Sequence, residues 1–456
     1  MAIWHAAVAA VDSRRLVRDN VRVERPWLWV GGERLLLSDV RRILVVGAGK
    51  AGAGMAEGFE GALGEAVMAE KQVTGWINVP EDCVRPLKRI HLHAARPPGL
   101  NEPTPAGVQG AEQILQLVRS AADEDLCVCL LSGGGSALLP APAAGITLAD
   151  KQALARHLSA AGANIRELNA VRKQLSRIKG GGLARACRAG CLITLIISDV
   201  LGDPLEVIAS GPTVPDPATP HEALDILRRF AAREAGISPR VFEFLTQAAE
   251  QPLQERAHLR TRVVHRIIGN NAKAVDAAGA EAERRGYAHA MMAATQLEGQ
   301  AEDVGRHLAE MADRMRREPG PDCLITGGEP VVQLAPPDRR GLGGRNQQLV
   351  LAALDRLIRL AEGRAPEPAT RNPLQALALL SGGTDGEDGP TDAAGAMIDE
   401  AVFDAMCRQH MLPQDYLRRN DAYHFFQPLG ALIKTGPTHT NVCDVRVAVV
   451  SRHGRR

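Results

Sequence analysis

The sequence predicts an α/β protein with two domains built from parallel α/β layers. Three observations support this prediction. The chain has 456 residues, of which 45% are hydrophobic, which is enough for more than one core. Short apolar runs alternate with alanine-rich or amphipathic stretches, as expected of strands and helices that pack in layers. Several runs end directly in glycine-rich or Ser/Asp-containing turns, which places polar groups at the carboxyl ends of strands, where open α/β sheets bind ligands.

Six apolar runs are the predicted strands: ILVV at 43–46, LCVCLL at 126–131, LITLII at 192–197, VVHRII at 263–268, CLIT at 323–326 and LALL at 377–380. Helices are predicted between them. The segment T-L-A-D at Thr147 resembles a capping box and begins an alanine-rich helix that runs toward Ala163, and a second helix is predicted over Glu222–Ala235. The polar segment Gln251–Arg262 is interpreted as the crossover between domains, placed at 1–255 and 256–456.

Composition excludes several classes of function. With 54 basic and 53 acidic residues, the chain has no charge excess that would favour nucleic acid as a partner. The opening MAIWHAAVAAVDSRR has a brief apolar run that basic residues follow rather than precede, unlike a secretory signal, and no run approaches the ~18 apolar residues of a membrane span. None of the eight cysteines forms a C-x-x-C pair. A cytoplasmic protein without membrane contact is expected.

The first motif is RRILVVGAGKAG, in which Gly47, Gly49 and Gly52 form G-x-G-x-x-G between a strand and a helix. Taken alone, this pattern indicates dinucleotide binding, because such glycines allow a tight turn and the helix N-terminus offers amides to an anion. A dehydrogenase also needs an acidic residue about 20 positions further on. Only Glu65 and Glu70 are near, and both lie in a helix-like stretch. The nicotinamide interpretation is therefore weakened.

Lys50 is the most informative residue of this motif. An ammonium group on the turn would point toward the ligand and neutralise a phosphate or carboxylate. It is not a Walker A lysine, because Ala51 follows it where Ser or Thr should bind magnesium, and Leu44 stands where the first glycine should be.

The second motif is CLLSGGGSALLPAP, directly after a predicted strand. Three consecutive glycines between two serines expose backbone N–H groups and two hydroxyls, a composition suited to phosphate oxygens. A tight strand-to-helix turn is the alternative. The pattern of a predicted strand followed directly by glycines recurs at 327–329 and 381–386, which favours anion binding over a merely structural turn. The predicted cradle consists of Ser132, Gly133, Gly134, Gly135 and Ser136.

The third motif, LIISDVLGDPLEVIASGPT, places Asp199 and Asp203 after another strand. Acids in this position hold magnesium or accept a hydroxyl proton, or else cap a helix or form an Asx turn. Asp203 precedes a proline and fits the structural alternative better. Asp199 is the predicted catalytic or magnesium-binding acid.

Two further motifs lie in the C-terminal half. GLGGRNQQL contains Arg345, whose guanidinium could bind a carboxylate or phosphoryl group with two hydrogen bonds, although a surface salt bridge is the alternative. SGGTDGEDGPTDAAG carries several acids among glycines, so a magnesium site and a solvated acidic loop compete as interpretations. Asp385 is the predicted magnesium and nucleotide ligand of this segment.

Seven segments together resemble the class II glycerate kinases, the family that joins an N-terminal glycerate-kinase domain to a C-terminal MOFRL domain. These segments are GAGKA at 47–51, SGGGSALL at 132–139, NAVRKQLSRIKGGGLA at 169–184, ISDVLGD with IASGPT at 197–213, GGRNQ at 343–347, SGGTDGEDGPTDAAGA at 381–396 and TGPTHTNVCD at 435–444. The resemblance covers nearly the whole chain.

The resemblance implies a Rossmann-like three-layer N-terminal half, a C-terminal α/β domain and a cleft between them. It implies ATP with Mg²⁺ as the donor and conversion of D-glycerate to 2-phosphoglycerate. Lys50 and Arg345 match the family's proposed cleft site, and Asp199 matches the acid of its I-S-D segment. Gly47, Gly49 and the 132–136 loop are then expected to bind the nucleotide.

Three segments depart from the family's pattern. Ala95-Arg96-Pro97 replaces the usual G-H-P, Gly327-Gly328-Glu329-Pro330-Val331 replaces G-G-E-T-T, and Gln348 ends the usual N-Q-E. Some proteins similar to this one carry a hydroxypyruvate reductase label, so NAD(P)H-dependent reduction of hydroxypyruvate is the alternative function. The sequence does not decide between the 2- and 3-hydroxyl of glycerate, and a homodimer is compatible with it.

Overall fold

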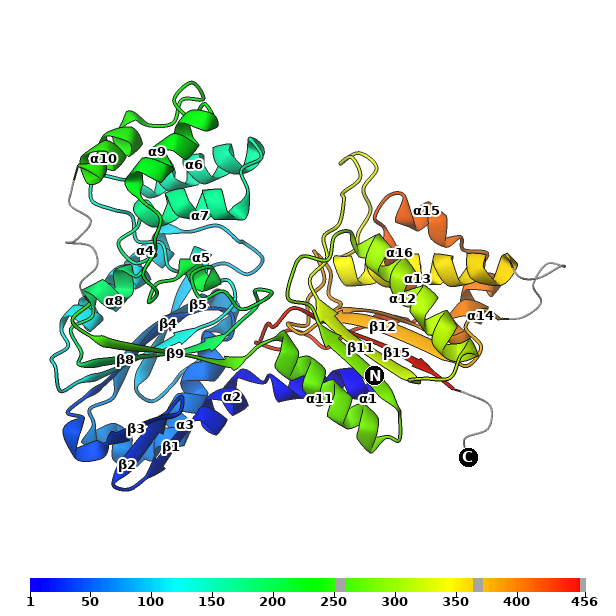
Figure 1. Cartoon of the computed structure of the whole chain (residues 1–456), viewed down its shortest axis with the longest axis horizontal. Helices are drawn as coiled ribbons and strands as arrows, with labels where there is room; N and C mark the ends of the chain where they lie inside the picture. Colours follow the sequence, from blue (N-terminus) through cyan, green and yellow to red (C-terminus); the bar gives the residue numbers. More distant parts are fainter. Residues whose placement is uncertain (251–258, 364–371, 452–456) are drawn as a thin grey trace. The chain divides into compact units, whose positions relative to one another are not determined.

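The computed structural model describes residues 1–250, 259–363 and 372–451. These residues form two compact units (Figure 1), here called the N-terminal unit, Ser13–Ile268, and the C-terminal unit, Met1–Asp12 with Gly269–Arg456. The boundary predicted after residue 255 lies outside the described residues and stays a prediction. Each unit has its own sheet.

The N-terminal unit is built on a six-stranded sheet of order β6-β5-β4-β7-β8-β9, in which β6 to β8 are parallel neighbours. Numbered by first appearance in the chain, this is the order 3-2-1-4-5-6 of dinucleotide-binding folds. The prediction of a Rossmann-like domain is therefore confirmed. The strands are β4 Ile43–Ala48, β5 Thr74–Pro80, β6 Ile90–Arg96, β7 Leu126–Leu131, β8 Cys191–Ile197 and β9 Arg262–Gly269.

Helices cover both faces of this sheet, which explains why its central strands are continuously apolar. Every residue of β4 and β7 is buried. In Figure 1, α3 lies on one face with a small antiparallel sheet, and α4 and α8 lie on the other. These elements are α2 Ser13–Asn20, β1 Val21–Glu24, β2 Trp27–Val30, β3 Glu33–Leu36, α3 Gly52–Glu70, α4 Pro105–Arg119, α5 Gly135–Leu138 and α8 Gly182–Ala186.

Four further helices form a cap with its own apolar core in the N-terminal unit. The predicted capping box is confirmed, because the Thr147 hydroxyl accepts from the N–H of Asp150 while the Asp150 carboxylate accepts from Thr147. The second predicted helix ends earlier than expected, since Ala231 takes a left-handed φ of 47°. The helices are α6 Leu148–Ala160, α7 Ile165–Gln174, α9 Pro220–Arg229 and α10 Pro239–Ala249.

The C-terminal unit contains a mixed six-stranded sheet of order β10-β11-β15-β12-β13-β14. Only β10 and β11 pair in parallel, because the last strand, β15, inserts antiparallel between β11 and β12. The expectation of parallel layers was therefore wrong for this half, although its α/β class is confirmed. The strands are β10 His289–Ala293, β11 Cys323–Gly328, β12 Leu377–Gly383, β13 Gly395–Ile398, β14 Leu432–Ile433 and β15 Asp444–Val450.

Helices again cover the two faces of this sheet (Figure 1), with α12 and α13 on one face and α1 and α11 on the other. The first residues of the chain belong here because the Trp4 indole donates to Gly382 O at 3.2 Å. Across the described ranges, no helix combines the length and apolar character that a membrane span needs. The helices are α1 Ala2–Ala10, α11 Asn271–Arg284, α12 Ala301–Arg317, α13 Arg345–Glu362, α14 Glu400–Arg408, α15 Pro413–Leu417 and α16 Ala422–Phe426.

Candidate active site at the carboxyl ends of the parallel strands

The strand order brings two of the predicted motifs side by side. β4 and β7 are neighbours with residues 43–48 in register with 126–131, and the chain reverses its direction of winding between them. Ligands of open α/β sheets bind at this switch point. The turn after β4 carries Lys50, and the turn after β7 is the 132–136 loop. Both therefore lie where a ligand is expected.

The glycines after β4 allow these two turns to pack directly against each other. A Cβ at Gly47 would lie 2.0 Å from Leu130 O, and one at Gly49 would lie 1.9 Å from Ser132 Oγ. Gly49 also has a φ of 146°, which L-residues rarely adopt. Larger residues would separate the turns.

The amides of the turn after β4 are already used by the protein. The N–H of Gly49 donates to Asn78 O at 3.2 Å, that of Lys50 to Gly133 O at 2.9 Å, and that of Ala51 to Ser132 Oγ at 3.0 Å. In dinucleotide-binding folds the corresponding amides face the pyrophosphate. In this conformation the G-x-G-x-x-G motif positions the neighbouring loop, and the nucleotide-binding role of Gly47 and Gly49 stays a prediction.

An acid does follow the second strand of the sheet, which the sequence did not lead us to expect. Glu65 and Glu70 lie in α3 as expected, but this helix has 19 residues and delays the second strand to Thr74–Pro80. Glu81 follows that strand directly. The spacing of about 20 residues used in the sequence argument was too short, so an acid does stand at the strand end.

The 132–136 loop has the unoccupied amides that the turn after β4 lacks. In the part of the chain that the structure describes, the N–H groups of Gly133, Gly134 and Ser136 make no hydrogen bond to the protein. Gly134 is left-handed with a φ of 76°. Successive free amides in such a turn form a concave site for an anion. The predicted phosphate cradle therefore has a suitable backbone.

Lys50 and Asp199 both lie against this loop. A Cβ at Gly133 would be 2.2 Å from Asp199 Oδ2, and one at Gly134 would be 3.7 Å from Lys50 Cγ and 3.1 Å from Arg96 Nη2. The structure thus brings together two of the three predicted catalytic residues. Arg96, known from the sequence only as a departure from the family pattern, supplies a second cation.

A second group of cations contacts the other end of the loop. Lys179 Nζ donates to both the carbonyl and the hydroxyl oxygen of Ser136, each at 2.7 Å, and Arg172 Nη2 donates to Ser136 Oγ at 3.2 Å. Burial lowers the pKa of Lys179 well below its usual value, and the nearby positive charge of Arg172 lowers it further. A bound anion would relieve this electrostatic cost.

Two glycine-containing segments hold Lys179 in place. The N–H of Gly180 donates to Ser210 O at 3.0 Å and that of Gly181 to Gly211 O at 2.7 Å. Ala209, Ser210 and Gly211 have left-handed φ values of 51°, 63° and 58°, and Ser210 Oγ lies 2.9 Å from Ser136 Oγ. Consecutive non-glycine residues in this region are strained and are typical of functional sites.

Arg345 in the C-terminal unit is engaged by carboxylates. Its Nε and Nη2 contact the two oxygens of Asp444 at 2.7 and 2.9 Å, and its Nη1 lies 2.9 Å from Glu329 Oε1. Burial alone would lower the pKa of the Arg345 guanidinium, but Asp444 and Glu329 raise it above its usual value. Desolvation raises the pKa of Glu329, against the effect of Arg345.

The glycine- and acid-rich loop after β12 has two distinct carboxylates. Asp388 is buried and accepts from the N–H groups of Asn346 and Gln347 at 3.0 and 2.8 Å, which caps α13. Burial raises its pKa to about 7 although these N–H groups oppose the shift. Asp385 Oδ1 accepts from the N–H of Glu387 at 3.2 Å. Within the described ranges, no group of three or more His, Cys, Asp or Glu is arranged as a metal site.

The predicted site residues are thus divided between the two units. Lys50, Asp199 and the 132–136 loop belong to the N-terminal unit, and Arg345 and Asp385 belong to the C-terminal unit. Arg172, Lys179 and Arg96 were not predicted as site residues. The segment RKQLSRIKGGG gave a signal for the first two, since its four basic residues stand in a stretch that ends in glycines.

The fold and the loop define an α/β protein with unbonded backbone amides at the switch point of a Rossmann-type sheet, among the residues that the structure describes. The chain matches the family of a domain of unknown function, DUF4147, over residues 1–246 and the MOFRL family over residues 322–444. It is 36% identical to glycerate kinase of Mus musculus over 464 residues, covering 90% of this chain and 84% of that protein. It is 34% identical to D-glycerate 2-kinase of Thermotoga maritima over 424 residues, covering 92% and 93%.

One relative bears a different name. A protein of Agrobacterium vitis, provisionally named a hydroxypyruvate reductase, is 37% identical over 413 residues, covering 90% of this chain and 99% of that protein. The solved structure of glycerate kinase from Thermotoga maritima matches with a TM-score of 0.80 at 31% identity, covering 99% of this chain and 98% of that chain. The chain belongs to the glycerate kinase family with a MOFRL domain.

Proposed function

We propose that this protein transfers the γ-phosphoryl group of ATP to the 2-hydroxyl of D-glycerate, giving 2-phosphoglycerate and ADP. Its family membership supports the kinase reaction, and the Thermotoga maritima relative is named for the 2-position. The observation that carries the proposal is the 132–136 loop, whose free amides lie between Lys50 and Asp199 at the switch point. This is an arrangement for phosphoryl oxygens with an acid beside it.

Asp199 is assigned to the acceptor hydroxyl. As the glycerate oxygen forms its bond to the γ-phosphorus, the bond from that phosphorus to the ADP oxygen breaks and the hydroxyl proton passes to the Asp199 carboxylate. Positioning and charge neutralisation supply most of the catalysis in such transfers. Lys50 and the amides of Gly133 and Gly134 therefore neutralise the negative charge of the moving group.

Magnesium fits the oxygen donors of this site. Mg²⁺ is usually held by one or two carboxylates together with substrate phosphates, so it does not require a cluster of three protein ligands. Asp385 is the predicted ligand when Asp199 takes the hydroxyl proton. Asp199, beside the loop, is the alternative ligand, and in that case it would not act as the base. When bound, the ion neutralises phosphate charge and orients the oxygens.

The test is a coupled assay for ADP with D-glycerate, ATP and Mg²⁺, run beside an assay for NADH oxidation with hydroxypyruvate. The product is identified by NMR. ADP together with 2-phosphoglycerate supports the proposal, and 3-phosphoglycerate would correct the position. NADH consumption without ADP formation would refute the kinase activity and favour hydroxypyruvate reduction. In that case Glu81 would be the candidate ligand of the cofactor ribose.

Asp199→Asn tests the assignment of the acid in the same assay. The expected result is a fall in kcat of at least about 100-fold, the usual size of a general-base contribution. Asp203→Asn is the matched control, because Asp203 stands four positions further on in a turn with a left-handed φ of 55°. Equal losses in both variants would remove Asp199 from the proton transfer.

A further inference from the structure

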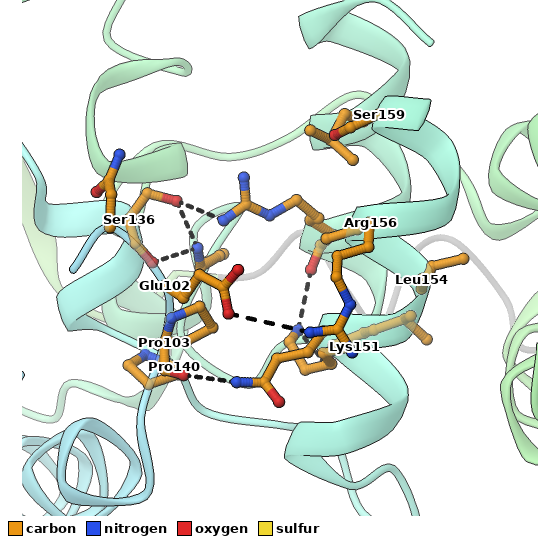
Figure 2. Close-up of a pocket in the computed structure, with 15 residues that line it drawn as sticks. Glu102, Pro103, Ser136, Pro140, Lys151, Leu154, Arg156 and Ser159 are labelled. Atoms are coloured by element: carbon orange, nitrogen blue, oxygen red, sulfur yellow. Dashed lines mark hydrogen bonds and ion pairs between the residues drawn. The ribbon is translucent and has the colours of Figure 1, made fainter. Parts of the chain in front are cut away.

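A cavity of about 370 Å³ opens beside the 132–136 loop, within the N-terminal unit. Figure 2 shows its position between α6, which carries Lys151, Leu154 and Ser159, and the opposite wall, which carries Ser136 and Pro140. Ser136 belongs both to this cavity and to the loop that faces Lys50 and Asp199. The cavity therefore borders the proposed site at Ser136.

Three of the cations that line the cavity form no ion pair with a carboxylate in the described part of the chain. Lys151 Nζ donates only to the carbonyl oxygens of Arg172 and Leu175, at 3.3 and 2.8 Å, and Lys179 and Arg172 donate to Ser136. None of the three forms an ion pair with a carboxylate that the structure describes. Lys173, next to Arg172 but outside the cavity lining, is in contrast paired with Asp216 at 3.1 Å.

Lys179 is buried, and Lys151 and Arg172 are half-buried. Taking unpaired cations out of water is costly unless a counter-charge is supplied. Burial lowers the pKa of Lys151 to about 7, with Arg172 adding to the shift, and burial also lowers the pKa of Arg172. Glu102 is the one carboxylate that lines the described cavity, and it lies 4.0 Å from Arg156 at an exposed position. An anionic ligand would provide the missing charge.

The apolar part of the lining restricts the kind of anion. Its residues are Leu154, Leu168, Leu175, Pro103 and Pro140. A three-carbon hydroxy acid has too little apolar surface to use these residues and would leave most of the volume empty. Cavities of several hundred Å³ with an apolar wall and a few polar groups suit ligands of cofactor size.

We propose that this cavity binds the nucleoside triphosphate, with the base against the leucines and prolines and the phosphate chain along Lys151, Arg172 and Lys179 toward Ser136. The inference rests on the proposed function, since it assigns the donor of that reaction to a pocket within one unit. The terminal phosphate then reaches the free amides of the 133–136 segment, beside Lys50 and Asp199. Glycerate is left outside the cavity.

Two substitutions test the proposal, one through the charge of the cavity and one through its volume. Lys151→Met removes a charge and keeps much of the side-chain length, and Ala155→Trp fills the cavity from α6. Ala153→Trp is the matched control for bulk, because Ala153 lies on the same helix and is exposed rather than lining the cavity. Lys88→Met is the control for charge, since Lys88 is exposed and pairs with Glu65.

The measurements are calorimetric Kd values for ATP and for inorganic tripolyphosphate, and KM values for ATP and glycerate, after circular dichroism has established folding. We expect Lys151→Met and Ala155→Trp to raise the Kd and KM for ATP at least about tenfold and to leave the glycerate KM within about twofold. Ala153→Trp and Lys88→Met behave as the unaltered protein. If Ala155→Trp does not fold, the weaker binding of tripolyphosphate by Lys151→Met still tests whether the cations of the cavity bind the phosphate chain.

Failure of this inference and failure of the proposed function give different results. If ATP binding is unchanged in both variants while the unaltered protein still forms ADP with glycerate, ATP does not bind in the cavity and the kinase reaction is unaffected by this result. A raised KM for glycerate alone overturns the inference also, because the cavity would then hold the acceptor. No ADP with glycerate, but ATP binding that weakens in both variants, supports the cavity and overturns the reaction.

Discussion

Gly133→Ala is expected to inactivate the protein by displacing Asp199 while the fold is kept. The added Cβ would lie 2.2 Å from Asp199 Oδ2 and 2.7 Å from its Cγ, whereas ordinary contacts begin at 3.4 Å. The carboxylate must therefore move by about 1 Å. Gly133 has no left-handed φ, so its backbone accepts alanine. Displacement of a reacting group by about 1 Å costs on the order of 100-fold in rate, or about 2.7 kcal/mol of activation free energy.

The assay compares kcat for Gly133→Ala, Asp199→Asn and the double variant, with thermal unfolding as the stability measurement. Because both changes act on one carboxylate, the double variant should lose little beyond Asp199→Asn alone. Gly61→Ala is the control, since no atom lies within 4 Å of its added Cβ and alanine there stabilises α3 by about 0.5–1 kcal/mol. A Gly133→Ala protein with kcat within threefold of the original, or fully additive losses, would refute the reasoning.

Three further predictions concern Lys50, Lys151 and Arg345. Lys50→Met should lower kcat/KM by about 100- to 1000-fold without a change in Tm, measured by the ADP assay and by calorimetry; retained activity would remove Lys50 from the site. Because the pKa of Lys151 is lowered to about 7, its ammonium is charged below that pH and neutral above it. ATP affinity should therefore fall as the pH rises from about 7.5 to 9. The phosphate oxygens of ATP titrate below this range and do not contribute to the change. Lys151→Met should lack this slope, and equal slopes would contradict the assignment. Arg345→Ala leaves the buried Asp444 carboxylate unpaired and should lower the free energy of unfolding by about 3–5 kcal/mol in urea denaturation, whereas an unchanged midpoint would show that the pair is not structural.

Much of the N-terminal sheet could be predicted from the sequence because its central strands are buried on both faces. Such strands appear as continuous apolar runs, and the runs at 43–46, 126–131 and 192–197 each lie within a strand. Strand β6 was not among the predicted strands because its sequence IHLHAAR alternates in burial and contains polar residues. The antiparallel insertion of β15 could not be predicted, since pairing direction depends on contacts between segments far apart in the chain.

The site could be predicted only where a short segment carried its own chemistry. The 132–136 loop was identified because glycines and serines follow a strand directly. Lys151 gave no such signal, because a lysine in an amphipathic helix is usually solvated. Its position depends on the carbonyl oxygens of Arg172 and Leu175 at the end of α7, a packing that no local pattern encodes. Arg345 was identified as a ligand-binding residue, but its bonds to Asp444 come from β15, 99 residues away along the chain.

The G-x-G-x-x-G turn shows why a motif must be judged by the partners of its amides. The same glycines that let a pyrophosphate approach the backbone also let a second loop approach it, and steric size alone cannot distinguish the two. Here the N–H groups of Gly49, Lys50 and Ala51 bond to protein oxygens, while those of Gly133 and Gly134 form no such bond in the described part of the chain. The turn after β7 is therefore the better candidate for anion binding than the turn after β4. Lys50 remains at the site because its backbone is fixed to Gly133 while its side chain extends past Gly134.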